Sequence, residues 1–297
     1  MKFIKTLFLV VLPSTLLLFL AFFLIHFFTG YEVHRDVRYG DLDKNTMDIY
    51  LPNNAIDRES NGCILMIHGG SWSGGDKSEE EIRCRMLASS GYVAVSINYS
   101  LWSEESKDSY TVLDVPDELD SALSKVKEFS AERGVNVDKA AIAGYSAGAH
   151  LALLYSYSRG DTAPMDITFT ASMAGPADIS TEAWGEDMAA RVGTRLTGTE
   201  ITADMLGSDE IQSLLKSVSP TSYVDENAPP TLIMHGGRDT VVPIENAKLL
   251  MNKLSAYSVP YDYVYLENSD HSLLQDPIKH LSFYKMLLSY CNTYFGY

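Results

Sequence analysis

Short apolar runs alternate along the chain with longer stretches in which apolar residues recur at helical spacing. The short runs predict strands over 46–51, 63–67, 92–97, 140–143, 168–174, 231–234 and 261–266. The longer stretches predict helices over 79–90, 119–129, 147–157, 244–254 and 278–294. This alternation indicates right-handed βαβ units, which build a mostly parallel sheet with helices on both faces. We therefore predict one α/β domain over residues 30–297.

Residues 176–223 interrupt this alternation. The stretch is rich in Gly, Thr, Glu and Asp, its apolar periodicity is weak, and only 209–218 has the pattern of a short helix. Insertions of this length in compact domains are usually lids or binding loops. We expect a small cap insertion here, lying over the functional site.

The first residues predict a membrane anchor. Lys2 and Lys5 precede an apolar run over 7–28, and about 20 apolar residues suffice for a helix to cross a bilayer. Large aromatic residues occupy the end of this run, where a cleaved signal peptide requires small ones. We predict an uncleaved anchor within residues 1–29, with its helix over about 6–28. The alternative is secretion after cleavage of a signal peptide.

The charges around this run favour one orientation of the anchor. Positive groups before the run slightly outweigh those after it, which predicts an N-terminus inside the cell and a domain on the extracytoplasmic side. The whole chain of 297 residues has a net charge of −16, without a cluster of Lys and Arg that would offset it. Such a surface repels phosphates, so we exclude nucleic acid as a partner.

Three cysteines are spread over the chain, at Cys63, Cys84 and Cys291. Their number is odd, and none belongs to a CxxC pair. This pattern suggests neither a disulfide framework nor a zinc site. We expect all three to be small apolar residues of the core.

Ser146 lies at the centre of Gly144-Tyr145-Ser146-Ala147-Gly148, between a predicted strand and a predicted helix. A nucleophilic serine in this position needs a tight strand-to-helix turn that lifts its hydroxyl out of the sheet. Side chains two residues before and after the serine would collide in that turn, which explains the two glycines. We predict Ser146 as a catalytic nucleophile. The alternative is an ordinary αβ turn lined by glycines.

A serine hydroxyl needs a base to become a nucleophile at neutral pH. His271 follows the last predicted strand, at the sheet edge where α/β proteins collect their active residues. The other histidines lie in or beside the anchor, inside helices, or in other loops: His26, His34, His68, His150, His235 and His280. We therefore predict His271 as the base, and we expect His68 to anchor its own loop.

A carboxylate should orient the histidine and stabilise its charged form. Asp239 follows the penultimate strand and is the predicted third member. Asp178 would have to reach from the start of the cap, and Asp270 adjoins the histidine and cannot easily face its far nitrogen. The resulting chain order, Ser, Asp and His, is the order found in α/β-hydrolases.

His68-Gly69-Gly70-Ser71-Trp72 follows the predicted strand 63–67. Glycines let a backbone approach a substrate, and backbone N–H groups can hold the negative oxygen of a tetrahedral intermediate. We predict Ala147 together with Gly70 or Ser71 as these oxyanion donors. Trp72 and Tyr145 are assigned to the substrate pocket.

Together these motifs resemble the α/β-hydrolase superfamily, in the esterase and lipase branch with hormone-sensitive-lipase-like enzymes and bacterial feruloyl-esterase-like domains. The similar runs cover most of the chain from about Thr46: HGGSWSGGDKS, GYVAVSINYSL, VDKAAIAGYSAGAHLALL, SPTSYV, PPTLIMHGGRDTVVP and DHSL. The resemblance implies an eight-stranded sheet, no metal and no organic cofactor, and hydrolysis through an acyl-enzyme. Many relatives have a third glycine in place of Ser71 and an acidic residue in place of Tyr145.

These features predict a carboxylic ester hydrolase that acts on a small-molecule ester, with small or short-chain acyl groups preferred. One alternative is an amidase or peptidase that uses the same three residues. Another, of a different class, is an inactive interaction module tethered to a membrane. The sequence predicts no particular oligomeric state.

Overall fold

The computed structural model describes residues 30–103 and 111–296. Its strands form one sheet in the order β1-β2-β4-β3-β5-β6-β7-β8. They are β1 (Tyr31–Arg38), β2 (Thr46–Pro52), β3 (Asn61–Ile67), β4 (Val93–Ile97), β5 (Val137–Tyr145), β6 (Asp166–Met173), β7 (Thr231–Gly236) and β8 (Tyr261–Leu266). β2 pairs antiparallel with β1 and with β4, and every other pair is parallel. The mostly parallel sheet predicted from the sequence is therefore confirmed.

β1 is the strand that the sequence pattern did not predict. It lies at the edge of the sheet, where only Tyr31 of its eight residues is buried. A bulge between His34 and Val37 also shifts its register against β2. β1 contains charged residues and a bulge, and it pairs with a neighbour on one side only. It therefore lacks the regular apolar alternation by which strands are identified in sequence.

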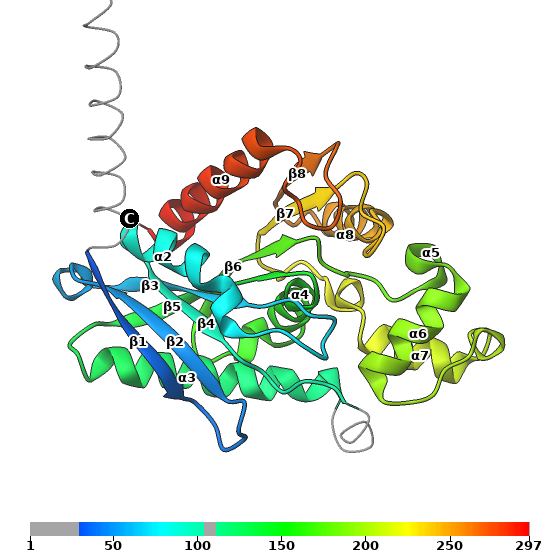
Figure 1. The fold of residues 1–297 in the computed structure, drawn as a ribbon, viewed down its shortest axis with the longest axis horizontal. Helices are drawn as coiled ribbons and strands as arrows, with labels where there is room; N and C mark the ends of the chain where they lie inside the picture. The colour runs from blue at the N-terminus through cyan, green and yellow to red at the C-terminus, as the bar shows by residue number, and fades with distance from the viewer. Residues whose placement is uncertain (1–29, 104–110, 297) are drawn as a thin grey trace, which may run out of the picture.

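Helices cover both faces of the sheet, and Figure 1 shows α3 and α9 on opposite sides of it. These helices are α2 (Glu81–Ser89), α3 (Val115–Ala131), α4 (Ala147–Arg159), α8 (Glu245–Ala256) and α9 (Pro277–Phe295). Along β3, Leu65 and Ile67 belong to the apolar cluster that contains α3 and α4. Ile64 and Met66 belong to the cluster that contains α2 and α9. Burial on both faces explains why this strand is a continuous apolar run.

The segment 176–223 contains three further helices, which lie together at the end of the molecule opposite β1 (Figure 1). They are α5 (Thr181–Trp184), α6 (Glu186–Thr197) and α7 (Asp209–Ser217). α6 was not predicted, because small residues such as Ala189, Ala190 and Gly193 take up much of its buried side and weaken the apolar signal. The end of α6 does have a signal in the sequence, because Gly198 ends the helix in the left-handed conformation with φ +70°.

The described residues also form short 3-10 helices: η1 (Ala55–Asp57), η2 (Lys77–Glu80), η3 (Val112–Asp114), η4 (Gly160–Thr162), η5 (Ala203–Met205) and η6 (Pro220–Tyr223). Cys63, Cys84 and Cys291 are buried free thiols. Across residues 30–103 and 111–296, every helix falls short of the length or the hydropathy that crossing a bilayer requires. The predicted anchor, residues 1–29, lies outside the described residues.

Candidate active site

Ser146 stands in a strained turn between β5 and α4. Its backbone has φ +54° and ψ −119°, a conformation that residues with side chains rarely adopt. A Cβ atom on Gly144 would lie 2.3 Å from the backbone of Gly148, and one on Gly148 would lie 2.0 Å from the carbonyl oxygen of Ile67. Both glycines are thus required for the turn to close against β3, as the predicted collision implied.

The structure brings Ser146, His271 and Asp239 together in one chain of hydrogen bonds. His271 Nε2 lies 2.9 Å from Ser146 Oγ, and His271 Nδ1 lies 2.8 Å from Asp239 Oδ2. A carboxylate can only accept, so Nδ1 carries the proton and Nε2 presents its lone pair to the serine hydroxyl. The loops after β7 and β8 meet because Gly236 and Leu266 are paired at the ends of these strands.

The carboxylate of Asp239 is fully buried and has several donors. Its Oδ1 accepts from the backbone N–H groups of Val241 and Val242, each at 2.9 Å. Burial alone would raise the pKa of Asp239, but the hydrogen bonds from His271 and the two amides outweigh it and lower this pKa. A second imidazole, His235, lies 3.6 Å from the same carboxylate, donates to the carbonyl of Val242 and has its pKa lowered by burial.

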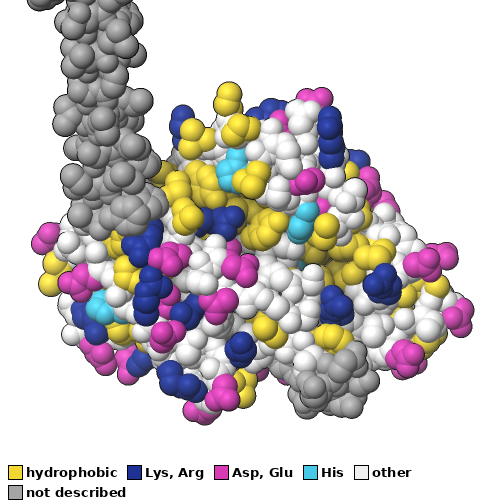
Figure 2. Space-filling model, viewed as in Figure 1, with side chains coloured by type: hydrophobic (Ala, Val, Ile, Leu, Met, Phe, Trp, Pro, Cys, Tyr) yellow, Lys and Arg dark blue, Asp and Glu magenta, His cyan; other side chains and the backbone are white. Residues whose placement is uncertain are grey.

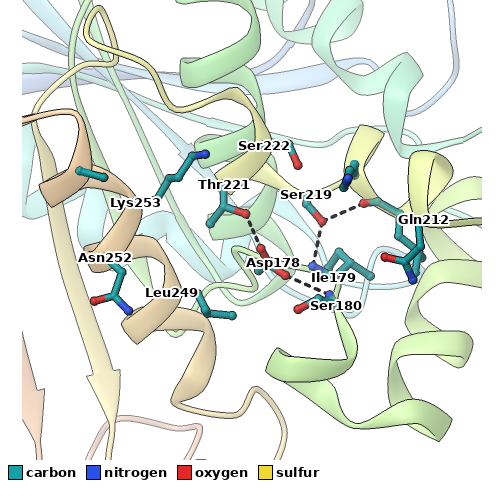
Figure 3. A pocket seen from close by; sticks show the side chains of 13 residues that line it. Asp178, Ile179, Ser180, Gln212, Ser219, Thr221, Ser222, Leu249, Asn252 and Lys253 are labelled. Carbon is teal, nitrogen blue, oxygen red and sulfur yellow. Dashed lines mark hydrogen bonds between the residues drawn. The ribbon is translucent and has the colours of Figure 1, made fainter. Parts of the chain in front are cut away.

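The two competing carboxylates have other partners. Asp178 accepts from the Thr221 hydroxyl at 2.5 Å and from the Ser180 N–H at 3.0 Å. It lines a separate cavity of about 410 Å³ between α7, η6 and α8 (Figure 3). Asp270 accepts from the N–H and the hydroxyl of Ser272. In the described part of the chain, the His271 imidazole is bonded to Asp239 and to neither of these.

The loop after β3 passes directly beside the serine turn. A Cβ atom on Gly69 would lie 3.3 Å from Ser146 Cβ. Gly70 has φ +112°, and a side chain there would meet the carbonyl oxygen of Gly74 at 2.1 Å. Ser71 follows with φ +53°, also in the left-handed region. The loop therefore holds an unusual backbone conformation next to the serine.

Three backbone N–H groups near Ser146 are free to bind a substrate oxygen. They belong to Gly70, Ser71 and Ala147, and within residues 30–103 and 111–296 none of them donates to another oxygen. Ala147 is the first residue of α4, where backbone N–H groups lack helical partners. Gly70 and Ser71 are exposed residues, so this part of the loop lies at the protein surface.

A buried histidine holds the other end of this loop, which the sequence did not reveal. The indole N–H of Trp72 donates to His150 Nδ1 at 3.2 Å, and His150 Nε2 donates to the carbonyl of Val218 at 2.8 Å. Trp72 has φ +60°, and its own carbonyl accepts from the N–H of Trp102 at 2.7 Å. These bonds fix the loop to α4 and to the end of the 176–223 segment. The available signal was a polar residue within the apolar first half of the predicted helix.

His68 lies at the start of the loop, where the sequence predicted an anchor. Its ring is buried and stacks on Tyr99 with 4.6 Å between ring centroids. Its Nδ1 lies 2.7 Å from the carbonyl oxygen of Gly69. Burial lowers the pKa of His68, so the ring is neutral and donates this bond.

The two residues assigned to the substrate pocket lie in different places. Trp72 lines a cavity of about 350 Å³ between the loop after β3 and α6. Tyr145 instead supports the histidine loop: its hydroxyl donates to the carbonyl of His271 at 2.7 Å, and the two rings are 5.3 Å apart. Burial raises the pKa of Tyr145 to about 12, so this donor keeps its proton. The tyrosine therefore holds the geometry of the histidine loop, and its place in the substrate pocket stays a prediction.

Comparison with known proteins gives consistent results. Residues 47–254 match the sequence model of the BD-FAE family. Esterase LipC of Mycobacterium tuberculosis is 26% identical over 238 residues, which cover 77% of this chain and 56% of LipC. Isoprenylcysteine alpha-carbonyl methylesterase ICME of Arabidopsis thaliana is 23% identical and is matched over 85% of this chain and 60% of its own length. The chain spans a little over half the length of several curated relatives.

Solved structures show the same fold. A truncated carbohydrate esterase from gut microbiota has a TM-score of 0.73 at 19% identity, covering 89% of this chain and 98% of the other. Esterase B from Lactobacillus rhamnosis, with a bound inhibitor, has a TM-score of 0.68 at 21% identity, covering 88% and 86%. With the family match, these likenesses confirm the predicted fold and superfamily. The chain belongs to the BD-FAE family, in the esterase and lipase branch of the α/β-hydrolases.

Proposed function

We propose that this protein is a serine hydrolase that cleaves carboxylic esters through an acyl-enzyme. The observation that carries the proposal is the hydrogen-bonded chain from Ser146 through His271 to Asp239, beside backbone N–H groups that have no acceptor among the described residues. Relatives named as esterases, such as LipC, support ester hydrolysis as the reaction. The alternative of an inactive module finds no support in a site whose three side chains are intact and aligned.

In the first half of the reaction, Ser146 Oγ attacks the ester carbonyl while His271 Nε2 takes the hydroxyl proton. The new imidazolium faces the buried Asp239 carboxylate, which stabilises its charge. The N–H of Ala147 and that of Gly70 or Ser71 donate to the carbonyl oxygen as it becomes negative. The intermediate then expels the alkoxide, which takes the proton from Nε2 and leaves as an alcohol.

In the second half, water attacks the acyl group on Ser146 and gives its proton to His271 Nε2. The second tetrahedral intermediate collapses, and Ser146 Oγ leaves and regains that proton. The products are a carboxylic acid and the free enzyme. An amide would follow the same steps with an amine as the leaving group, so the two substrate classes differ only in the first half.

The substrates that we propose are esters with small or short-chain acyl groups. The cavity of about 350 Å³ beside Trp72 is near the lower end of the range for small-molecule sites, which supports small groups. A panel of p-nitrophenyl esters from acetate to laurate, with the matching p-nitroanilides, measures this preference. Faster turnover of the anilides would reassign the protein to the amidases.

The decisive experiment compares the full-length protein with its Ser146→Ala variant on p-nitrophenyl butyrate. We expect a loss of at least about 10³-fold in kcat. Ser121→Ala is the matched control, because Ser121 is an exposed serine of α3 whose hydroxyl donates to the Asp117 carbonyl. Equal rates for the wild type and Ser146→Ala would refute the assignment. A fluorophosphonate probe that fails to label the wild type would favour the inactive module.

We also propose that the N-terminal apolar run keeps the protein at a membrane, with the α/β domain on the extracytoplasmic side. The proposal rests on the run over 7–28 and on its aromatic end. Membrane fractions washed with alkaline carbonate should retain the protein at its full-length mass. A shortened protein in the medium would indicate a cleaved signal peptide instead.

A further inference from the structure

Two arginines of α6 line the cavity of about 350 Å³ next to the loop after β3. Arg191 and Arg195 are four residues apart, so both project from the same side of the helix. Trp72 and Trp102 supply aromatic walls of the same cavity. Basic side chains stand beside apolar ones where the α5–α7 segment meets the body of the domain (Figure 2).

These two arginines differ from the other arginines of the chain. Eight of the ten donate to an oxygen: Arg35, Arg38, Arg58, Arg83, Arg85, Arg133, Arg159 and Arg238. Arg191 donates to Met188 Sδ at 4.0 Å, and Arg195 lies over the Trp102 ring, 5.4 Å from its centroid. Among residues 30–103 and 111–296, neither donates to an oxygen, although acidic residues outnumber basic ones in this chain.

Trp102 adds a further donor to the walls of this cavity. Its indole Nε1 is buried and makes no hydrogen bond within the described residues. An indole N–H can only donate, and leaving it buried and unpaired is unfavourable. Trp102 lines the cavity, so a bound acceptor group is a partner available to this N–H. Two guanidinium groups and an indole N–H are all donors, and this combination suits an anionic, oxygen-rich ligand.

The cavity also adjoins the site of ester cleavage. Trp72 lines it and directly follows Ser71, and Trp102 is tied to Trp72 by a backbone hydrogen bond. Trp72 is two residues from Gly70, which limits their separation to about 7 Å along the chain. A group bound here can therefore belong to the same molecule as the ester held at Ser146.

We propose that this cavity, with Arg191, Arg195 and Trp102, binds a carboxylate of the substrate and selects esters that carry one a few bonds from the scissile carbonyl. The inference rests on the proposed ester hydrolysis and names its substrate class. Glu200 lines the same cavity, and its negative charge opposes the binding of such a ligand. The arginines and Glu200 therefore have opposite effects on the binding of a carboxylate. Removing the arginine charges should weaken this binding, and removing the Glu200 charge should strengthen it.

The test uses the full-length protein and two pairs of esters that differ in one carboxylate. Ethyl hydrogen adipate and ethyl hexanoate vary the acyl side, and 4-acetoxybenzoate and 4-tolyl acetate vary the alcohol side. In Arg191→Gln/Arg195→Gln, we expect kcat/KM for the carboxylated member of at least one pair to fall about tenfold or more, mainly through KM. The neutral members should stay within about twofold, which also shows that the variant is folded.

Two further variants sharpen the result. Lys125→Gln/Lys248→Gln removes the same charge from a partly exposed and an exposed lysine, each paired with a glutamate, and it should leave the preference unchanged. Glu200→Gln should raise kcat/KM for the carboxylated ester at least about twofold, because it removes a repulsion. Added NaCl should weaken the preference of the wild type.

Binding gives a readout that does not depend on turnover. Calorimetry of adipate with Ser146→Ala should detect binding, and the double arginine substitution in that background should weaken it about tenfold or more. Absence of adipate binding, together with equal effects on charged and neutral esters, would overturn the carboxylate site while ester hydrolysis stands. If the double arginine variant instead loses activity only on a neutral acetylated sugar, the carboxylate site would be overturned in favour of a sugar site. If the wild type hydrolyses none of these esters, the proposed function is refuted. The adipate titration would then still decide whether the carboxylate site exists.

Discussion

His150 should make the folding stability of this protein depend on pH. It lies fully buried in α4, one turn after Ser146, with Nδ1 accepting from Trp72 and Nε2 donating to Val218. Burial lowers the pKa of His150 to about 4 from its ordinary 6.5, and the hydrogen bond to the Val218 carbonyl offsets this only in part. The folded protein therefore keeps this ring neutral at a pH where the unfolded chain protonates it.

The sign and size of the effect follow from these two pKa values. The contribution is fully present above pH 6.5, and it is lost as the pH falls toward about 4, because the unfolded state binds the proton first. Each pH unit in that window is worth about 1.36 kcal/mol. Between pH 7.5 and 4.5, the loss from His150 alone amounts to about 2.5 kcal/mol.

Urea unfolding at pH 7.5 and 4.5 measures this loss, with circular dichroism and fluorescence as independent probes of the transition. The His150→Asn variant is less stable at both pH values but cannot titrate. Its stability should fall by about 2.5 kcal/mol less than that of the wild type between them. Leu153→Ala, at a buried apolar position of the same helix, is the control: it lowers stability at both pH values and should keep the wild-type difference. If His150→Asn also keeps the full difference, the reasoning is refuted.

Three further substitutions test the site. Tyr145→Phe removes the hydroxyl that holds the His271 loop and should lower kcat roughly tenfold with little change in KM. Steady-state rates equal to those of the wild type would contradict this role of the hydroxyl. Asp239→Asn should lower kcat by roughly 10³- to 10⁴-fold without unfolding the protein, because an amide favours the wrong imidazole tautomer, and a small loss would reassign the carboxylate. Gly148→Ala places a Cβ 2.0 Å from a β3 carbonyl and should cost about 1–3 kcal/mol or more in a thermal melt. Gly160→Ala, which enters open space, should change stability by less than about 0.5 kcal/mol.

Local patterns were enough to predict most of the sheet and the three side chains of the site. Strands such as β3 are buried on both faces, so their apolar runs stand out in the sequence. The turn at Ser146 imposes glycines at two fixed positions, because any side chain there meets backbone atoms. His271 and Asp239 follow strands whose ends share one edge of a parallel sheet.

The tertiary structure decided what no local pattern contains. α6 was missed because its buried side is made of small residues, and β1 because it is an edge strand with a bulge. Tyr145 and His271 are 126 residues apart in the chain, and Trp72 and His150 are 78 apart. The order of the strands and the path of the 176–223 segment bring such residues together. The sequence by itself determined which residues can do the chemistry, because sterics and burial act over a few neighbouring residues. Only the folded chain decided which distant side chains support them.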